Sequence, residues 1–275
     1  MRQADRPPTP DDTIGTRDLT SWHSRFGRWL VAVTTRTVQW SSAHLAFVVF
    51  AAIAIVVMVG LVEGIETVYE SVAENRSLAA VDQPVLDAAV SLRSPGLDSA
   101  VTDFTDVGGP VGMPILAAGA VAVITWRRRR WTPITLALVA AAGSLAMTIV
   151  GKDFVARARP PAALAVPPLE ISPSFPSGHT LNATVLTAVV AYLVLIETTA
   201  TWQRVVTITV ATLFVVAMGL SRVFLGHHWL TDVVAGWLIG LAWALVVVTA
   251  HRLWLTLRQR PKGTPAATGG TVVTD

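Results

Sequence analysis

The chain has 275 residues, of which 52% are hydrophobic and only 14% are charged, and its formal net charge is +3. A soluble domain of this size would carry roughly a quarter charged residues, so the composition indicates an integral membrane protein. The absence of cysteine excludes disulfides and cysteine-ligated metal sites. A pI of about 9.9 is compatible with nucleic-acid binding, but the basic residues lie mainly beside apolar segments. Membrane topology explains them without a nucleic acid.

The amino-terminal segment contains no apolar core of a cleavable signal peptide. We predict that the polar residues 1–20 are disordered. Residues 25–40, RFGRWLVAVTTRTVQW, combine aromatic residues with spaced arginines, a pattern that fits either an interfacial helix or a cytoplasmic linker. We therefore divide the chain into a cytoplasmic segment at 1–42, a membrane domain at 43–252 and a flexible cytoplasmic tail at 253–275.

Six stretches approach the length of about 20 apolar residues that a helix needs to cross a bilayer. They lie at residues 43–64, 108–126, 132–151, 180–197, 204–220 and 229–250. The sequence therefore predicts an all-α fold, a bundle of six transmembrane helices.

The distribution of lysine and arginine predicts the orientation of this bundle. With the amino terminus in the cytoplasm, fifteen of the 21 basic residues fall in inner segments, as the positive-inside rule requires. Both termini are then cytoplasmic. The outer loop 65–106 is acidic, and its stretch VLDAAVSLRS at 85–94 is a candidate for short interfacial helices.

Four of the six outer basic residues lie in two short segments, at 152–159 and at 222. The first segment, KDFVARARP, separates Lys152 from Arg159 by seven residues, which is close to two helical turns and would place both on one face. Taken alone, such residues are most often lysines and arginines that extend from the end of a span to the interface.

The second segment, SFPSGHT at 174–180, precedes the fourth predicted span. Ser177 is a suitable N-cap residue, Gly178 allows the backbone to approach a ligand closely, and His179 lies in the first turn. The free N–H groups of a helix start bind anions. Taken alone, the segment also fits an ordinary cap with an interfacial histidine.

The third segment, SRVFLGHHWLTD at 221–232, places His228 and Asp232 four residues apart, on one face of a helix. An aspartate beside a histidine fixes the tautomer of the ring and stabilises its imidazolium form. Because Asp232 would lie inside a span, where a carboxylate is costly, a functional role is favoured over a structural ion pair. On the same helix His227 would point elsewhere, and we interpret it as a bystander.

The predicted topology brings the three segments together at the outer face. The converging residues are Lys152, Arg159, Ser177, His179, Arg222, His228 and Asp232. Three permanent cations would repel a divalent metal, so no metal and no cofactor is predicted. Arginine side chains match the geometry of phosphate oxygens instead, and the set predicts a phosphate site with two histidines.

These segments resemble the signature of the type-2 phosphatidic acid phosphatase superfamily, K-x6-RP, PSGH and SR-x5-H-x3-D. The sequence matches it at every position, through Lys152–Pro160, Pro176–His179 and Ser221–Asp232. Order, spacing and the six predicted spans agree as well. The resemblance covers about the last half of the chain.

The resemblance implies an all-helical core and metal-independent hydrolysis of phosphate esters. His228 would be the nucleophile that forms a phosphohistidine, Asp232 would orient it, and His179 would protonate the leaving oxygen and then activate water. The phosphate oxygens would be bound by Lys152, Arg159, Ser177, Gly178 and Arg222.

A site at the outer membrane interface favours a lipid-linked phosphate as substrate. A polyprenyl diphosphate carrier is our first expectation, with phosphatidic acid or phosphatidylglycerophosphate as alternatives. Vanadate-dependent haloperoxidases share the family pocket, but they are soluble. A lipid transporter would more often show internal repeats and polar groups midway along its spans. The sequence does not indicate an oligomeric state.

Overall fold

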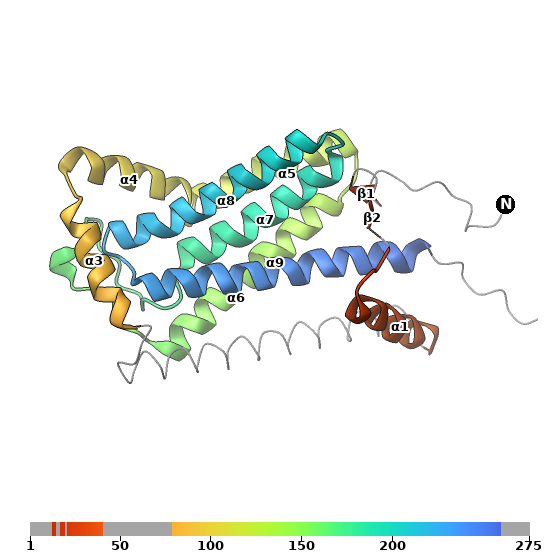
Figure 1. Cartoon of the computed structure of the whole chain (residues 1–275), viewed down its shortest axis with the longest axis horizontal. Helices are drawn as coiled ribbons and strands as arrows, with labels where there is room; N and C mark the ends of the chain where they lie inside the picture. The colour runs from red at the N-terminus through yellow and green to blue at the C-terminus, as the bar shows by residue number, and fades with distance from the viewer. Residues whose placement is uncertain (1–12, 15–16, 20, 41–78, 260–275) are drawn as a thin grey trace, which may run out of the picture.

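The computed structural model describes residues 13–14, 17–19, 21–40 and 79–259, and almost all of this part is helical (Figure 1). The α-helices are α1 (Arg25–Trp40), α3 (Asp82–Ser91), α4 (Pro95–Val107), α5 (Gly112–Arg128), α6 (Thr132–Val155), α7 (Gly178–Glu197), α8 (Thr201–Phe224) and α9 (Leu230–Gln259). Two 3₁₀ turns, η2 (Ala79–Val81) and η3 (Ala162–Leu164), and two strands, β1 (Thr13–Ile14) and β2 (Arg17–Asp18), complete the described elements. The predicted all-α fold is confirmed for this part, apart from the two-residue antiparallel pairing of β1 and β2.

The helices α6, α7, α8 and α9 are each long and apolar enough to cross a membrane. They contain the predicted spans 132–151, 180–197 and 204–220, and α9 begins one residue after the start of the predicted span 229–250. The helices α4 and α5 form a pair bent by 49°, which brings the number of spans in the described residues to five if the pair is one span. The predicted span 43–64 lies outside the described residues. The protein is therefore a multi-pass membrane protein.

The predicted span 108–126 differs from the structure at its start. Gly108 ends α4 as its C-cap, and α5 begins only at Gly112. Pro110, between them, has no N–H to continue a helix ladder. The apolar run is therefore divided between a turn and a 17-residue helix, α5. This helix is long and apolar enough to cross a membrane only together with α4.

The helix α7 is the centre of the bundle. In its 18-residue apolar stretch 56% is buried, whereas the corresponding share in α8 is 17%. Its closest neighbour is α9. A Cβ atom placed on Gly240 would lie only 2.7 Å from Cβ of Thr184, so the absence of a side chain lets the two helices approach. The helix α9 also contacts α6, where the Trp243 indole Nε1–H donates to the carbonyl oxygen of Ala140 at 3.1 Å.

Two terminal predictions are corrected. Within the segment predicted to be disordered, β1 pairs with β2 and Leu19 is buried, with its carbonyl accepting from Arg252 Nε at 2.9 Å. At the other terminus α9 continues to Gln259, so the boundary at residue 252 falls inside a helix rather than at the start of a flexible tail. For residues 25–40, where the sequence left an interfacial helix and a linker open, the structure has a helix, α1.

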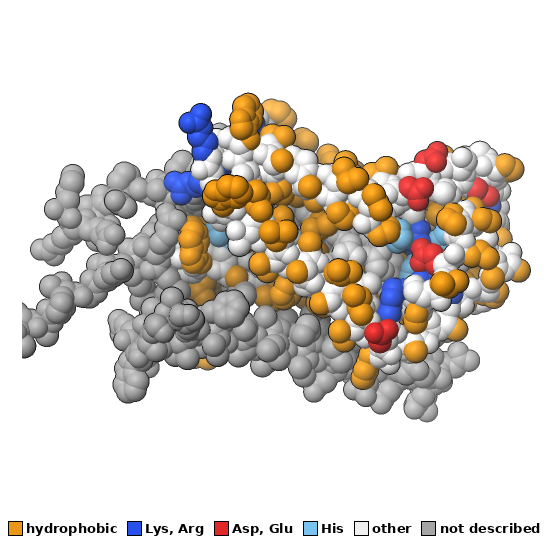
Figure 2. All heavy atoms as spheres, turned by 180° about the vertical axis from the view of Figure 1, so that it is seen from behind, with side chains coloured by type: hydrophobic (Ala, Val, Ile, Leu, Met, Phe, Trp, Pro, Cys, Tyr) orange, Lys and Arg blue, Asp and Glu red, His pale blue; other side chains and the backbone are white. Residues whose placement is uncertain are grey.

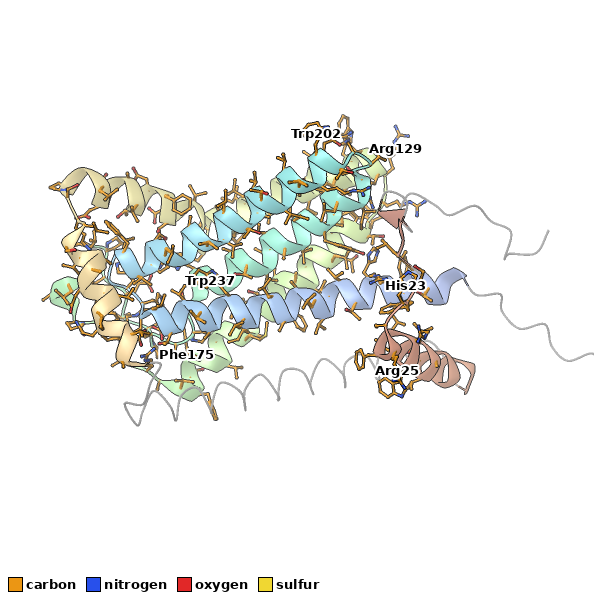
Figure 3. All side chains as sticks on the ribbon, in the orientation of Figure 1. His23, Arg25, Arg129, Phe175, Trp202 and Trp237 are labelled. Atoms are coloured by element: carbon orange, nitrogen blue, oxygen red, sulfur yellow. The ribbon has the colours of Figure 1, made fainter. Side chains whose placement is uncertain are left out.

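The two ends of the bundle differ in chemistry. Arg129 and Trp202 lie at one end, and Phe175 lies at the other, beside α3 (Figure 3). Hydrophobic side chains cover the length of the bundle. The acidic side chains visible in Figure 2 gather at the α3 end together with basic and histidine side chains, and further basic side chains lie at the opposite end. Along the length of the bundle, large apolar side chains such as Leu138 and Leu213 are exposed, as expected of surfaces that face lipid. The functional groups are therefore concentrated at one end.

Candidate active site

The site is assembled from five chain segments at the α3 end of the bundle. They are the end of α6, the segment 156–177, the start of α7, the end of α8 and the start of α9. Backbone hydrogen bonds join them, because Val166 N–H donates to the carbonyl of Leu225 at 2.9 Å and Ser177 N–H donates to the carbonyl of Asp232 at 3.1 Å. The segment 156–177 thus has fixed positions against both α8 and α9.

The turn after α8 decides where the two adjacent histidines point. Gly226 has a left-handed φ of 73°, and a Cβ atom there would lie 2.5 Å from the carbonyl oxygen of Leu164, so the turn requires glycine. The helix α8 ends at Phe224 and α9 begins at Leu230. The prediction that His227 and His228 belong to a helix is therefore wrong.

His228 nevertheless meets Asp232, across the start of α9. The His228 side chain is 1% exposed, and its Nδ1 lies 3.5 Å from Oδ2 of Asp232. Its Nε2 lies 3.2 Å from Nη1 of Arg159. A guanidinium only donates, so this contact assigns the lone pair to Nε2 and the proton to Nδ1, facing Asp232. The arrangement is that of an oriented nucleophile.

The pKa of His228 is lowered to about 4, mainly because burial disfavours the charged ring. The Asp232 carboxylate, 3.5 Å from Nδ1, acts against this shift, while Arg159 and Arg222 add to it. At neutral pH the ring is therefore neutral, and its Nε2 lone pair is available.

Asp232 is fully buried, and both of its oxygens are held by other groups. Its Oδ1 accepts from Nη1 of Arg157 at 2.5 Å. Its Oδ2 accepts from the backbone N–H of Trp229 at 2.9 Å and from the hydroxyl of Ser174. The carboxylate is thus fixed without any substrate.

On the opposite side of the His228 ring, the Glu170 carboxylate lies between two arginines. Its Oε2 is 2.6 Å from Nη2 of Arg159, and its Oε1 pairs with Nη2 of Arg222. It also lies 4.0 Å from Nε2 of His228 and 4.0 Å from Nδ1 of His179. The carboxylate therefore occupies the position at which a phosphate would meet both arginines and both rings.

The charge of Glu170 is set by these neighbours. Burial alone would raise the pKa of the carboxyl group, but Arg222 and Arg159 outweigh it and lower the pKa to about 2. The group is therefore an anion at physiological pH. Arginine pairs in the same way with carboxylate and phosphate oxygens, so this contact demonstrates an oxyanion-binding geometry with a carboxylate as the anion.

Lys152 and Arg159 are close together, but not for the predicted reason. The helix α6 ends at Val155, so they do not share a helical face. Instead both side chains bind Ser172. Lys152 Nζ donates to Ser172 Oγ at 3.1 Å, and Arg159 Nε donates to the Ser172 carbonyl at 2.6 Å. The segment 156–177 is what brings the two cations together.

The start of α7 departs in detail from the predicted cap. Ser177 occupies the N-cap position, but its hydroxyl caps no backbone N–H and instead accepts from Thr180 Oγ1 at 2.9 Å. Gly178 lies against Thr148 of α6, where a Cβ atom would be 3.0 Å from Cγ2. His179 lies in the first turn, and both Gly178 and His179 line the cavity described below.

His227 does not face away from the site as predicted. Its Nε2 lies 2.7 Å from the carbonyl oxygen of Val166, and its Nδ1 lies 3.9 Å from Oε1 of Glu170. The ring is 5% exposed. Burial lowers its pKa, and Arg222 adds to the shift, so the ring is neutral and Nε2–H donates to Val166. His227 holds the segment 156–177 and borders the site.

A cavity of about 720 Å³ opens beside these groups. Its polar end is lined by Lys152, His179, Arg222 and His228, and its other end by Leu145 and additional apolar side chains of α5, α6 and α7. Leu145 is 57% exposed on the outer surface of α6. The cavity therefore connects the charged site with the apolar surface of the bundle.

Four residues of the site were missed by sequence reasoning. Arg157 and Ser174 lie inside the analysed segments, and their position between matched residues was a signal that could have been used. Glu170 lies in the segment 156–177 between Leu169 and Ile171, and Asp82 is the first residue of α3. Nothing in their local sequence indicates that they reach the site.

Comparison with known proteins gives consistent matches. A family model described as the PAP2 superfamily matches residues 116–255, a range that includes every predicted site residue. Phosphatidylglycerophosphatase B of Bacillus subtilis (strain 168) is 31% identical over 169 residues, covering 61% of this chain and 81% of that protein. Phosphatidylglycerophosphatase B of Escherichia coli (strain K12) is 41% identical over 96 residues, which are 34% of this chain and 33% of that protein.

The fold also has a match among solved structures. A crystal structure described as the first transmembrane PAP2 type phosphatidylglycerolphosphate phosphatase, from Bacillus subtilis, superposes with a TM-score of 0.61. The sequences are 27% identical, and the match covers 69% of this chain and 93% of the other.

Proposed function

We propose a specific reaction for this chain, which belongs to the PAP2 superfamily and is a membrane lipid phosphatase. In this proposal it removes the terminal phosphate of a phospholipid such as phosphatidylglycerophosphate, through a phosphohistidine on His228. One observation carries the proposal: the Glu170 carboxylate pairs with Arg159 and Arg222 and lies 4.0 Å from Nε2 of His228. A phosphate in its place would be positioned for attack.

The first step forms a bond between His228 Nε2 and phosphorus, and the bond between phosphorus and the lipid oxygen breaks. His179 donates a proton to that leaving oxygen, which departs as an alcohol. The imidazole becomes positively charged as it attacks, and Asp232 stabilises that charge at Nδ1. Phosphoryl transfer depends mainly on positioning and charge stabilisation, both of which these groups supply.

The second step hydrolyses the phosphohistidine. His179, now neutral, removes a proton from a water molecule, whose oxygen attacks phosphorus while the bond to Nε2 breaks. Inorganic phosphate leaves, and both histidines return to their initial protonation states. Through both steps the phosphate oxygens would be bound by Lys152, Arg159, Arg222 and the start of α7 at Ser177 and Gly178.

Two observations support a lipid with a phosphomonoester head. The cavity runs from the charged site to an apolar side of the bundle, so a phosphate can occupy the site while acyl chains remain in lipid. The similar proteins named above are phosphatidylglycerophosphatases. Phosphatidic acid offers the same phosphomonoester with a smaller head, and it is an alternative substrate.

A polyprenyl diphosphate is the second candidate, and Lys152 favours it. The Glu170 carboxylate pairs with Arg159 and Arg222, whereas Lys152 Nζ binds Ser172 and Pro173. A third cation beside the first two would suit the second phosphate of a diphosphate.

A panel of lipid phosphates tests the choice. The purified full chain in detergent would be given phosphatidylglycerophosphate, phosphatidic acid and a polyprenyl diphosphate, and phosphate release would be followed. The highest kcat/KM is expected for phosphatidylglycerophosphate, with activity retained in EDTA and inhibited by vanadate, which mimics the phosphoryl group in transit. His228→Ala controls for contaminating phosphatases. Loss of activity in EDTA, restored by one divalent ion, would contradict the metal-independent mechanism.

We also propose that the chain has six spans, with residues 43–64 as the first, and that the site faces the extracytoplasmic side. The arginines at 127–130 and at 252 support this orientation, because they belong to the end of the bundle opposite the site. A cysteine introduced at Pro167 should react with an impermeant thiol reagent in intact cells, and one introduced at Arg128 should not. The reverse labelling pattern would place the chemistry on the cytoplasmic side.

A further inference from the structure

Asp82, the first residue of α3, is a buried carboxylate that lies far from the motifs in sequence. It is 3% exposed, and all its hydrogen bonds lead toward the site. Its Oδ1 accepts from the backbone N–H of Thr231 at 2.9 Å, and its Oδ2 accepts from Thr231 Oγ1 at 2.7 Å and from Arg157 Nη2 at 2.8 Å. Asp82 therefore connects the outer helix α3 to the first turn of α9.

Arg157 continues this connection to Asp232. One terminal nitrogen, Nη2, binds Asp82, and the other, Nη1, donates to Asp232 Oδ1 at 2.5 Å and to Thr231 Oγ1 at 2.7 Å. The Arg157 guanidinium carbon also lies 5.7 Å from the centre of the Trp229 ring. The Arg157 guanidinium is thus fixed through both of its terminal nitrogens, and its orientation determines where Asp232 Oδ1 lies.

We propose that Asp82 and Arg157 are positioning residues for phosphoryl transfer, which hold the Asp232 carboxylate against Nδ1 of His228. The inference rests on the proposed role of His228 as nucleophile. Neither residue reaches the phosphate position, because Asp232 and Thr231 lie between them and the His228 ring. They act only through Asp232.

The charges explain why two residues are needed rather than one. A fully buried Asp232 beside a neutral imidazole would be an unpaired charge, which is costly, and Arg157 compensates it. If Asp232 were its only partner, the Arg157 guanidinium could form a bidentate pair with both oxygens of the Asp232 carboxylate. Asp82 occupies the second nitrogen, so Arg157 binds Oδ1 alone and Oδ2 remains directed toward the ring.

Four single variants of the full chain in detergent test the proposal. They are Asp82→Asn, Arg157→Gln, Arg157→Lys and Asp87→Asn. Asp87 is the matched control, because it lies on the same helix and is exposed, with Gln83 as its hydrogen-bond partner at 2.8 Å. Turnover would be measured with the lipid phosphate that the wild-type chain hydrolyses fastest, so the test does not depend on which lipid that is.

We expect Asp82→Asn to lower kcat by about 10- to 100-fold, the usual effect of losing a group that orients a reactive side chain. KM should change by less than about twofold, since the phosphate contacts are untouched. Arg157→Gln should lower kcat further, and Arg157→Lys should recover part of the loss, because lysine still donates to Asp232. Asp87→Asn should match the wild type.

The same changes in an Asp232→Asn background separate positioning from general structural support. If Asp82 acts through Asp232, Asp82→Asn should cost less than about twofold there, as measured by single-turnover phosphorylation with an activated phosphate ester. An unchanged kcat in the Asp82→Asn single variant would overturn the proposal. An equal loss with and without the Asp232 carboxylate would overturn it too.

If Arg157→Gln fails to fold, Asp82→Asn decides the matter, because it leaves the pairing of Arg157 with Asp232 in place. Failure of the proposed function has a different result. If the wild-type chain hydrolyses another lipid phosphate but not phosphatidylglycerophosphate, only the proposed substrate is wrong. Activity that survives His228→Ala would contradict the nucleophile itself.

Discussion

The two sides of the His228 ring are built in different ways. On the Nδ1 side, Asp232 is fully buried and each carboxylate oxygen accepts hydrogen bonds from fixed protein groups. On the Nε2 side, Arg159 and Arg222 face a cavity, and the Glu170 carboxylate lies between them. One side is complete without substrate, and on the other a protein carboxylate occupies the position of a ligand.

This difference assigns separate tasks to the two sides. Electrostatic preorganisation is effective when the groups do not have to move during the reaction, and the Asp232 side meets that condition. In the proposed reaction, the Glu170 side has to exchange one anion for another in every catalytic cycle. Changes on the first side should therefore affect kcat, and changes at Glu170 should affect KM.

The largest effect is expected at the ring itself. His228→Ala should lower kcat by about 10⁴- to 10⁶-fold, as loss of a covalent nucleophile does. His227→Ala is the comparison, and it should retain most of the chemistry, because its Nε2 binds Val166 rather than a reacting atom. The measurement is acid-labile, base-stable phosphate label on protein quenched during turnover. Label on His227 or His179 would show that the roles are assigned to the wrong residues.

Asp232→Asn should lower kcat by about 10³- to 10⁴-fold with little change in KM. An amide removes the charge that stabilises the imidazolium, and it can favour the wrong tautomer of the ring. Steady-state kinetics at saturating lipid would measure this. A proportional rise of KM without a fall of kcat would contradict the division of tasks between the two sides.

His179→Ala should lower steady-state turnover by about 10²- to 10⁴-fold, the range of general acid–base catalysis. The nucleophile remains, so a substrate with a good leaving group should still phosphorylate His228. Without a base for the second step, the phosphohistidine should accumulate. A rapid-quench experiment that finds no accumulation with an activated ester would place His179 outside the second step.

Glu170→Gln should lower KM severalfold while kcat changes less. The neutral amide competes less well for Arg159 and Arg222, so a smaller part of the binding energy is lost in displacing it. The result would be read from lipid-concentration series at fixed detergent. An increase of KM would mean that Glu170 contributes to binding rather than competing with it.

The smallest expected effect is a shift on the pH axis. Burial lowers the pKa of His228 to about 4, so the nucleophile should stay neutral well below pH 6.5, and the acid limb of kcat/KM should lie closer to 4, after correction for ionisation of the substrate. The charged groups that face the ring are Asp232, Arg159, Arg222 and Glu170. Since the unfolded chain binds this proton near pH 6.5 and the folded one near 4, His228 reduces stability as the pH falls through that interval. An acid limb near 6.5 would mean an accessible ring.

The sequence predicted the four long apolar helices and the motif residues that meet at one end of the bundle, because both depend on local patterns. Apolar length alone located α6 to α9, and motif spacing identified His228, His179 and the three cations. The helical periodicity applied to Lys152 and Arg159, however, failed, because α6 ends between them at Val155, where Ala156 takes a left-handed conformation. Their proximity depends on Ser172, which no spacing in the motif contains.

Long-range partners were not predictable in the same way. Asp82 is 150 residues from Asp232, and nothing in the acidic loop distinguishes it from Asp87, which is exposed. Glu170 was missed because a carboxylate is unexpected among residues chosen to bind phosphate. Both depend on how α3 and the segment 156–177 pack on α8 and α9, a tertiary arrangement that one sequence does not reveal.

The bonding of Arg157 and Arg159 to partners from the final helical hairpin has a consequence for synthesis. Because the chain is made from its amino terminus, these two arginines leave the ribosome well before His227, His228 and Asp232. Until α8 and α9 have been inserted, the cationic segment 156–177 lacks the Asp232 carboxylate that binds Arg157 and the His227 carbonyl that binds Arg159. The reactive centre is therefore assembled only after α9 has been made, and a chain that stops before α9 contains no assembled phosphatase site.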